Sequence, residues 1–374
     1  FAPAHAHYLY GRSFYKDVFT VSKKAQPAFD YYMKQASSFW NDENRYSQGM
    51  IALALKKKKK REIPEKIIKS LKEHALHSEE MGMYWKSKHG FYWYQAPIET
   101  QAMMIEVFDE VAGDKKAVEE LKIWLLKQKQ TQAWNSTKST ADAVYALLLR
   151  GQNLLAETGQ AKISLGNITI EPGKDNEIET EAGTGYFKKV WNRDQVKPEM
   201  GNITVSKPGS GIAWGALYWQ YFEQLDKITG HETPLSIEKK IYIEKMTDEG
   251  EKLFPVEENQ TLKIGDKMIV RISIETDRAM EFVHLKDMRA AGLEPLNVLS
   301  GYRYQGGLGY YESTKDASSN FFISYLPKGS YVFEYPLRVT HQGDFSNGIT
   351  TIQCMYAPEF ASHSQGVRIK TEDK

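Results

Sequence analysis

Hydrophobic residues change their spacing near residue 158 of this chain. Before that point apolar side chains recur every three to four residues, the period that gives a helix one apolar face. After it, short runs alternate between apolar and polar positions and are broken by Gly, Pro and Asn, as in strands joined by turns. The pattern predicts a multidomain chain in which helices come first and β-modules follow.

Seven helices are predicted in the first part. Their ranges are 4–15, 27–40, 46–57, 64–80, 97–111, 116–129 and 140–153. Pro64 and Pro97 stand in first turns, where a residue without an N–H costs little. Ser139 followed by Asp142 resembles a capping box, and Gly151 is expected to interrupt the last helix.

Three of these helices share a local pattern of one polar residue, one small residue and an apolar stripe. The pattern begins at Gln48, Gln101 and Asp142, at intervals of 53 and 41 residues. Each interval is long enough for about one helix pair, which predicts stacked helical hairpins. The longer first interval contains an aromatic insert over residues 83–95.

Strands are predicted throughout the second part. Their ranges are 162–170, 186–191, 203–206, 214–222, 240–244, 261–264, 268–276, 280–287, 309–313, 320–325, 330–340 and 350–355. Residues 229–234 read as a linker, and Pro327-Lys328-Gly329 as the turn of a hairpin. Seven or eight short strands in about 140 residues suggest a β-sandwich after the linker.

Charge and cysteine content exclude several classes of protein. The net charge is +1, whereas a nucleic-acid-binding domain needs a basic face. Six consecutive cations at residues 56–61 are the exception; they are explained as a solvated helix end that complements the helix dipole, with an anion-binding patch as the alternative. One cysteine, Cys354, rules out an internal disulfide. The first residue is Phe, so the chain is expected to be a piece of a longer protein.

No constellation of a known metal or cofactor site stands out. His74, His77 and Glu80 are spaced three apart and could hold a metal ion, but a solvated helix face explains them. Glu99, Asp142 and Glu106 are expected near helix starts, and capping together with the helix dipole explains the carboxylates of Glu99 and Asp142. We therefore predict no metal, no cofactor and no enzymatic activity.

Several segments resemble the α2-macroglobulin family, in the style of its bacterial branch. Residues 131–140, Thr-Gln-Ala-Trp-Asn-Ser-Thr-Lys-Ser-Thr, resemble the last repeat of the family's thioester domain, and residues 98–102 the preceding inner helix. Residues 277–292 resemble the strand and Ala-Gly turn of the last macroglobulin-like domain. Residues 343–360, from Gly343-Asp344-Phe345 through Met355-Tyr356-Ala357-Pro358-Glu359-Phe360, resemble its closing strands.

The resemblance implies a partial α/α toroid followed by β-sandwich modules. Residues 1–157 would be an incomplete thioester-domain-like toroid, 158–233 half of a split CUB-like domain, and 234–374 a macroglobulin-like β-sandwich. In the family the first half of the CUB-like domain precedes the toroid. The middle module is therefore expected to be incomplete, with unpaired edge strands or a swapped partner.

The resemblance also implies a function. Family members inhibit endopeptidases: a protease cuts a bait segment, the inhibitor collapses around it, and in many members a thioester captures it. That thioester needs Cys and Gln three residues apart, but Cys354 is followed at this distance by Ala357. The implied partners are proteases, met by the full-length parent outside the cytoplasm, in the periplasm or at the cell surface. Membrane anchoring would come only from a preceding N-terminal region.

A binding pocket is expected at the turn that closes the toroid, where it would shape or shield a thioester. Its candidate residues are Trp134, Ser136, Thr137, Thr140, Glu99 and Tyr94.

Two other functions remain open. An α/α toroid with β-sandwiches is also the plan of carbohydrate-active enzymes, and the aromatic side chains of Trp85, Trp93 and Trp134 could stack on sugars. The third possibility is a non-catalytic surface scaffold.

Overall fold

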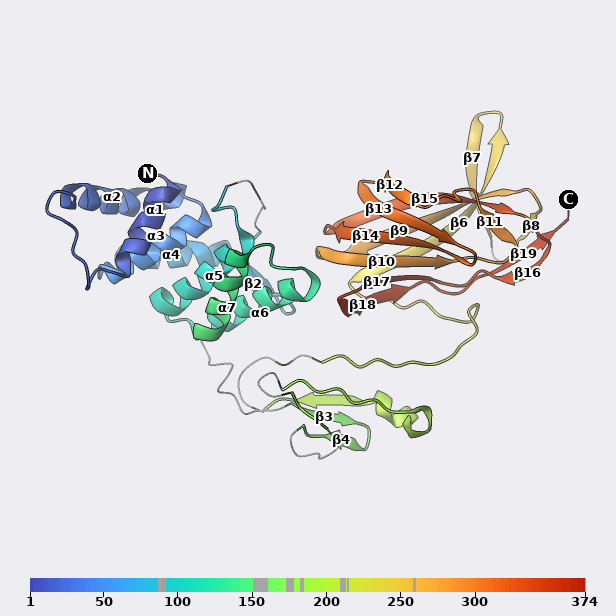
Figure 1. Ribbon diagram of the computed structural model, residues 1–374, viewed down its shortest axis with the longest axis horizontal. Coiled ribbons are helices and arrows are strands. Elements are labelled where there is room, and N and C mark those ends of the chain that lie inside the picture. Colours follow the sequence, from blue (N-terminus) through green and yellow to red (C-terminus); the bar gives the residue numbers. More distant parts are fainter. Residues whose placement is uncertain are drawn as a thin grey trace. The chain divides into compact units, whose positions relative to one another are not determined.

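The chain folds into two compact units, which we call the helical unit and the sandwich unit (Figure 1). The helical unit comprises residues 1–127 and 134–215, and the sandwich unit residues 128–133 and 216–374. The computed structural model describes residues 1–86, 90, 92–150, 161–172, 178–181, 185–208, 213, 215–257 and 260–373. Helices come first and several β-sheets follow, so the predicted fold class is confirmed.

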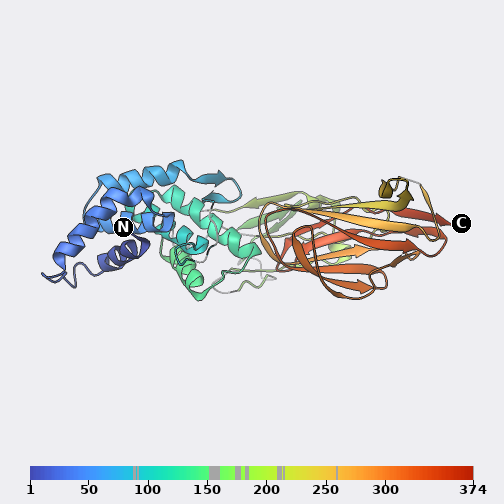
Figure 2. The same cartoon turned by 90° about the horizontal axis from the view of Figure 1, so that it is seen from above.

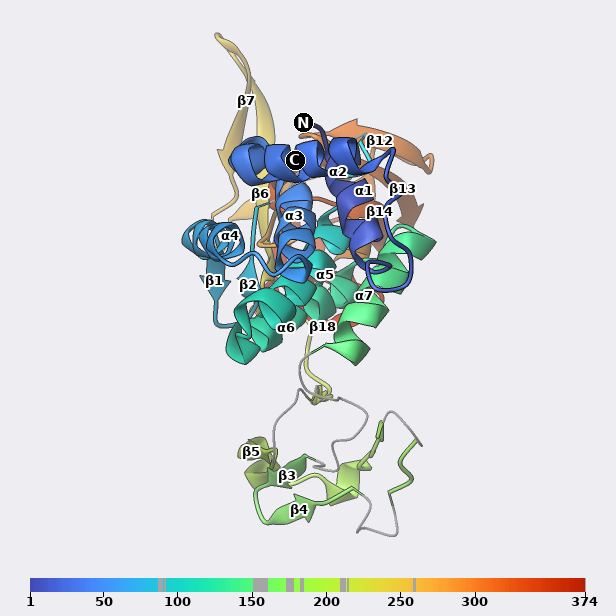
Figure 3. The same cartoon turned by 90° about the vertical axis from the view of Figure 1, so that its left-hand side faces the viewer.

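All seven predicted helices are present. They are α1 (Pro3–Ser13), α2 (Gln26–Phe39), α3 (Arg45–Lys57), α4 (Glu62–Glu73), α5 (Pro97–Val107), α6 (Lys115–Thr131) and α7 (Thr137–Leu149). The odd-numbered helices contact one another in the order α1–α3–α5–α7, and α2, α4 and α6 connect them in the sequence (Figure 3). The described helices thus form consecutive hairpins, as the repeat predicts.

Small residues allow the central helices to approach closely. A Cβ on Gly49 of α3 would lie only 2.7 Å from Met103 Cγ and from Met104 Cε of α5. Ala102 and Ala143, at the same position of the pattern in α5 and α7, are also buried. The small residue in the pattern therefore serves close helix packing.

The prediction that the fourth helix continues to residue 80 is wrong. It ends at Glu73 and is followed by a hairpin of β1 (Leu76–Ser78) and β2 (Gly82–Tyr84). Met83 and Trp85, two residues apart, both bury their side chains in the helical core. This spacing is typical of a strand and does not place two side chains on one face of a helix. The fifth helix passes at Phe108 into a π-helical turn, Phe108–Ala112.

A small open sheet completes the helical unit. It contains β3 (Lys162–Leu165), β4 (Ile168–Ile170) and β5 (Ile203–Ser206) in the order β4–β3–β5, and two short 3-10 helices, Arg193–Gln195 and Pro198–Gly201, precede β5. The strand predicted over 162–170 is instead a hairpin that turns at Gly166, where φ is +55°. No strand forms over 186–191 or over 215–222 among the described residues; Trp214 and residues 151–153, where Gly151 lies, fall outside them.

The sandwich unit is built from two large sheets and a small one. Its strands are β6 (Leu235–Thr247), β7 (Gly250–Pro255), β8 (Thr261–Lys263), β9 (Lys267–Thr276), β10 (Met280–Met288), β11 (Leu293–Pro295), β12 (Gly301–Gln305), β13 (Leu308–Lys315), β14 (Ser318–Leu326), β15 (Gly329–Val339), β16 (Gly343–Ser346), β17 (Thr350–Cys354), β18 (Ala357–His363) and β19 (Arg368–Glu372). Their orders are β12–β13–β14–β10–β17–β18, β11–β15–β9–β6–β7 and β16–β19–β8. In Figure 2 the long strands run along the length of this unit.

Apolar side chains of both large sheets form one core. Leu285 and Phe321 come from the six-stranded sheet, and Ile272 and Phe333 from the five-stranded one. Alternation along these strands gives each sheet one apolar face, which is why they pack as a sandwich. Segment 327–329 does not turn a hairpin, because β14 and β15 belong to different sheets.

Candidate functional site at the start of helix α7

Three side chains link the start of α7 to the start of α5. Ser136 is the N-cap of α7, and its Oγ accepts a hydrogen bond of 3.0 Å from the backbone N–H of Ser139. The two hydroxyl oxygens lie 2.8 Å apart, and Ser139 Oγ donates to Glu99 Oε1 over 2.9 Å. The expected cap at Ser139 is therefore wrong, since Ser136 caps the helix and Ser139 reaches across to α5.

The carboxylate of Glu99 is held in a largely dry position. Glu99 is only 7% exposed. It lies in the first turn of α5, where the helix dipole favours a negative charge. No side chain caps α5, whose N-cap is Ala96. Glu99 does lie at a helix start, as predicted, but no local sequence pattern indicated its hydrogen bond to Ser139 of another helix.

A second polar group lies in the same turn of α7, at Lys138, one residue before Ser139. Lys138 Nζ donates to Asp142 Oδ2 over 2.7 Å and to the hydroxyl of Tyr46 over 3.2 Å. Burial raises the pKa of Tyr46, although Lys138 opposes this. Burial alone would lower the pKa of Lys138, but its hydrogen bonds to Asp142 and Tyr46 outweigh burial and raise it. Lys138 therefore remains a cation at neutral pH.

Aromatic side chains surround this polar group. Tyr46 meets Trp93 edge to face with 5.9 Å between ring centroids, and His7 of α1 lies 5.2 Å from the same indole. Tyr94 stacks on Tyr92 at 5.4 Å and meets Trp93 edge to face at 5.6 Å. The aromatic insert is thus packed beside the helix starts, and its Phe91 lies outside the described residues.

The structure brings together some of the predicted pocket residues. Ser136 and Glu99 are joined through Ser139, and Thr140 Oγ1 donates to the carbonyl of Ser136 over 3.1 Å. Trp134 is partly buried against the helical core, and Thr137 is exposed. Tyr94 belongs to the aromatic cluster.

Lys138 and Tyr46 were missed by the sequence analysis. The spacing of Lys138 and Asp142 by four residues was the available signal, because such a pair lies on one helix face. Tyr46 could not be connected to it without knowledge of the helix packing. Nothing in this arrangement resembles a nucleophile with its base: among the described contacts, no histidine is hydrogen-bonded to Ser136 or Ser139.

The candidate metal ligands do not converge. His77 lies in β1 and pairs with Glu120 at 3.2 Å, while His74 Nδ1 lies 2.8 Å from the carbonyl of Ser70. The expectation of a shared helix face for these histidines is wrong, because the helix ends between them. Within the described part of the chain, no group of three His, Cys, Asp or Glu residues could hold a metal ion.

A separate buried carboxylate lies in the last turn of α5. Glu106 Oε2 accepts from the hydroxyl of Tyr10 over 2.8 Å, and its Oε1 lies 3.3 Å from Arg150. Arg150 also pairs with Glu110 at 2.6 Å and lies 3.8 Å from Asp109. Burial raises the pKa of Glu106, while Tyr10 and Arg150 offset part of the effect. Glu106 was wrongly placed near a helix start.

The sandwich unit contains a more enclosed charge network. Lys239 of β6 pairs with Asp287 of β10 at 2.6 Å, with side chains 4% and 0% exposed. Tyr335 of β15 donates to Asp287 Oδ2, and Thr350 of β17 to Asp287 Oδ1. Burial and then Asp287 raise the pKa of Tyr335 well above its ordinary value. This network ties the two large sheets together.

The single cysteine is also enclosed. Cys354 is fully buried at the end of β17, and its Sγ lies 3.4 Å from the carbonyl of Glu281. Burial raises the pKa of its thiol, which disfavours the reactive thiolate.

Comparison with known proteins identifies the sandwich unit. Residues 235–359 match the bacterial alpha-2-macroglobulin MG10 domain. An alpha-2-macroglobulin homolog of a Nostoc species is 22% identical over 301 residues, which cover 75% of this chain and 15% of that protein. A circularly permutated Ras protein 2 of Dictyostelium discoideum is 21% identical over 108 residues, which cover 29% of this chain and 3% of that protein.

A solved structure of Escherichia coli alpha-2-macroglobulin activated by porcine elastase is also similar. It is 14% identical, with a TM-score of 0.43, and the match covers 98% of this chain and 35% of that chain. The chain thus spans much less than two thirds of the length of each of these relatives. Residues 235–359 are thus similar to the MG10 domain of bacterial alpha-2-macroglobulins, and the similarity to the Nostoc homolog extends over 75% of the chain.

Proposed function

We propose that this chain is the C-terminal region of an inhibitor that traps endopeptidases by collapsing around them after a bait segment is cut. The observation that carries the proposal is the MG10 domain match over most of the sandwich unit. Family members are protease inhibitors that act outside the cytoplasm, and proteases are the corresponding partners. We place the parent protein in the periplasm or at the cell surface and assign no enzymatic activity to this chain.

The proposed domain layout is a partial toroid over 1–157, half of a split CUB-like module over 158–233 and a macroglobulin-like sandwich over 234–374. The open sheet β4–β3–β5 supports the middle assignment, because β4 and β5 have no further strand partner among the described residues. Few buried apolar side chains support this sheet, namely Leu165, Ile170, Ile178 and Met200. Such a small core is typical of a module that is completed by another segment.

In the proposed mechanism this chain does not capture the protease covalently; it forms part of the body that encloses the protease. Cys354 has Ala357 three residues later, where a thioester would need Gln, and its thiol is buried. A thioester, if the parent carries one, would form elsewhere in the parent. The turn at residues 134–140 would then shape or shield it, since Ser136 and Ser139 fix this turn to Glu99.

The test uses the full-length parent and several endopeptidases. Residual activity is measured on a large protein substrate and on a small peptide after incubation with the inhibitor. We expect activity on the protein to fall at least tenfold while activity on the peptide is kept, because trapping excludes only large substrates. Equal loss on both would indicate active-site inhibition, and unchanged activity on both would contradict inhibition.

Glycan binding is the second candidate, and one observation favours it. Tyr302, Tyr311 and Phe322 lie in register across β12, β13 and β14, and all three are exposed. Tyr302 and Tyr311 meet edge to face with 5.1 Å between centroids. Binding to a glycan panel that is lost in a Tyr302→Ala, Tyr311→Ala variant would support this function.

A further inference from the structure

A basic and aromatic surface lies on the helical unit, far in sequence from the proposed inhibitor elements. We call it the basic rim and define it as residues 12–24 and 56–61. These segments contain ten of the chain's 49 Lys and Arg residues but one of its 48 Asp and Glu residues, Asp17. Since the whole chain has a net charge of +1, positive charge is concentrated here.

The helix dipole explains only part of this charge. Lys56 and Lys57 lie in the last turn of α3, where cations are favourable. The four following cations lie beyond the helix, and Lys58, Lys59, Lys60 and Arg61 are all exposed. Because neighbouring like charges repel one another, the dipole of α3 alone does not account for these four cations.

Exposed apolar side chains stand among these cations. Phe14, Tyr15, Val18 and Phe19 are between 47% and 70% exposed. Lys57 Nζ lies 3.6 Å from the centroid of the Phe14 ring, which places charge and apolar surface in direct contact. Basic residues interleaved with exposed aromatic residues are typical of surfaces that lie in the headgroup region of a bilayer.

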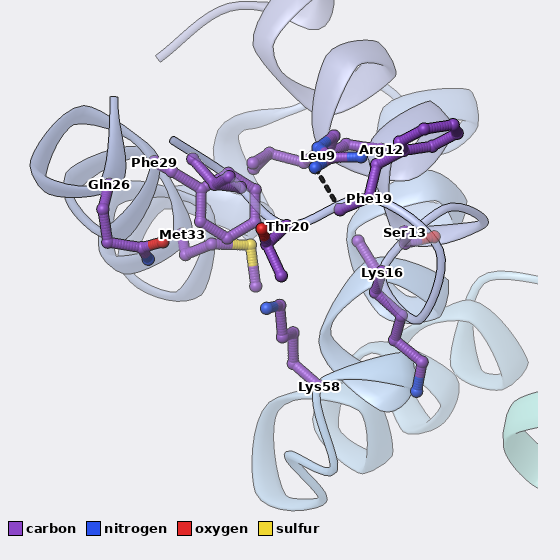
Figure 4. A pocket seen from close by; sticks show the side chains of 12 residues that line it. Leu9, Arg12, Ser13, Lys16, Phe19, Thr20, Gln26, Phe29, Met33 and Lys58 are labelled. Carbon is purple, nitrogen blue, oxygen red and sulfur yellow. Dashed lines mark hydrogen bonds between the residues drawn. The ribbon is translucent and has the colours of Figure 1, made fainter. Parts of the chain in front are cut away.

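A cavity of about 150 Å³ opens within the basic rim (Figure 4). Arg12, Lys16 and Lys58 line it together with the apolar Phe29 and Met33. Figure 4 shows the Lys58 side chain reaching from just beyond the end of α3 toward Phe29 and Met33 of α2, and its Nζ lies 5.0 Å from the Phe29 centroid. Cations and apolar groups line the same cavity, and this combination matches a phosphate headgroup with its glycerol and acyl carbons.

We propose that the basic rim docks onto a bilayer surface that contains anionic phospholipids. Charge complementarity selects the anionic headgroups, and Phe14, Val18 and Phe19 enter the interfacial region. Such a contact would hold the helical unit at a membrane independently of any anchor in another part of the parent protein. The contact does not depend on the proposed trapping function.

The test measures sedimentation of the 374-residue chain with vesicles. One set contains phosphatidylglycerol and phosphatidylcholine in a 1:3 ratio, and the other phosphatidylcholine alone. We expect binding to the anionic vesicles, with weakening in 0.5 M salt, and at least tenfold weaker binding to the neutral ones. A Lys58→Gln, Lys60→Gln, Arg61→Gln variant should bind about 100-fold more weakly, from about fivefold per cation.

A matched variant controls for net charge. Lys240→Gln, Lys245→Gln, Lys252→Gln removes three exposed cations of β6 and β7 and should change binding less than threefold. A Val18→Ala, Phe19→Ala variant, which keeps every cation, should bind about tenfold more weakly. Circular dichroism of each variant establishes that it is folded.

Three results would overturn the proposal. These are no binding of the wild-type chain to anionic vesicles, equal binding to both vesicle sets, and equal losses in the rim and control variants. The first of these results has a special case, in which the chain binds no vesicles but binds a soluble polyanion such as polyphosphate with the same dependence on residues 58–61. That outcome would reassign the rim as a polyanion site.

Discussion

Both units of the molecule bury a carboxylate that accepts a hydrogen bond from a tyrosine and pairs with a cation, but they balance its charge differently. In the sandwich unit Asp287 has Lys239 as its own cation, and Thr350 and Tyr335 satisfy its oxygens. In the helical unit Glu106 shares Arg150 with two other carboxylates. The first network is locally neutral, whereas the second carries excess negative charge.

The difference shows what each network contributes. Asp287 joins β10 to strands of both sheets, so its hydrogen bonds fix the registration of the sandwich. Glu106 lies in the last turn of α5, and burial raises its pKa because Tyr10 and the shared Arg150 offset burial only in part. The Asp287 network should therefore contribute most to the free energy of unfolding. The Glu106 network should contribute to the dependence of that free energy on pH.

The largest expected effect is loss of the Asp287 charge. Asp287→Asn should lower the free energy of unfolding by about 3–5 kcal/mol, because Lys239 remains buried without a counter-charge. Urea denaturation of the whole chain, followed by far-ultraviolet circular dichroism, measures this loss. Asp344→Asn is the matched control, since its partner Arg368 is about half exposed, and it should cost less than about 1 kcal/mol.

Removing both members of the buried pair should cost much less than removing one. A Lys239→Met, Asp287→Leu variant should lie within about 2 kcal/mol of the wild type, because no uncompensated charge is left. The same denaturation experiment provides a double-mutant cycle with the two single variants. Additive losses would mean that the pair does not act as a unit.

An effect smaller than that of Asp287→Asn is expected at the start of α7. Ser139→Ala removes the donor to Glu99 and should cost about 1–3 kcal/mol, because a buried carboxylate oxygen then lacks its partner. Thr140→Ala removes an exposed hydroxyl from the same turn and should change stability by less than about 0.5 kcal/mol. Thermal unfolding of the two variants compares them; equal losses would contradict the role of Ser139.

The smallest effect concerns pH. The raised pKa of Glu106 means that the folded state holds its proton to higher pH than the unfolded chain, where the pKa is about 4.3. Stability from this group therefore falls as pH rises above about 4.3 through the folded pKa. Glu106→Gln should remove this decline, so its stability relative to wild type should rise with pH across that window. Parallel pH profiles would rule out the effect.

The sequence predicted the helices better than the strands for a physical reason. An amphipathic helix has a long apolar stripe, so all seven helices could be located from their period. β7 has no buried residue and therefore shows no alternation, which explains why it was missed. The turn at residues 327–329 has hairpin residues, yet it crosses between sheets, and only the packing of β14 and β15 decides this.

The candidate site could be predicted only in part. Ser136 and Glu99 were chosen for their resemblance to family segments, but Ser139, which joins them, acts across 40 residues of sequence. The pairing of Glu106 with Arg150 depends likewise on how α5 and α7 pack. Contacts between helices are not encoded in local periodicity, so they required the structure.

The central claim, that the parent traps proteases, is tested most directly by size-exclusion chromatography. The full-length parent is incubated with an active endopeptidase, and peptidase activity on a small substrate is measured in each fraction. We predict that this activity elutes with the parent protein and cannot digest a large protein substrate. Peptidase activity that elutes only at the position of free protease, beside intact or fragmented parent, would contradict the claim.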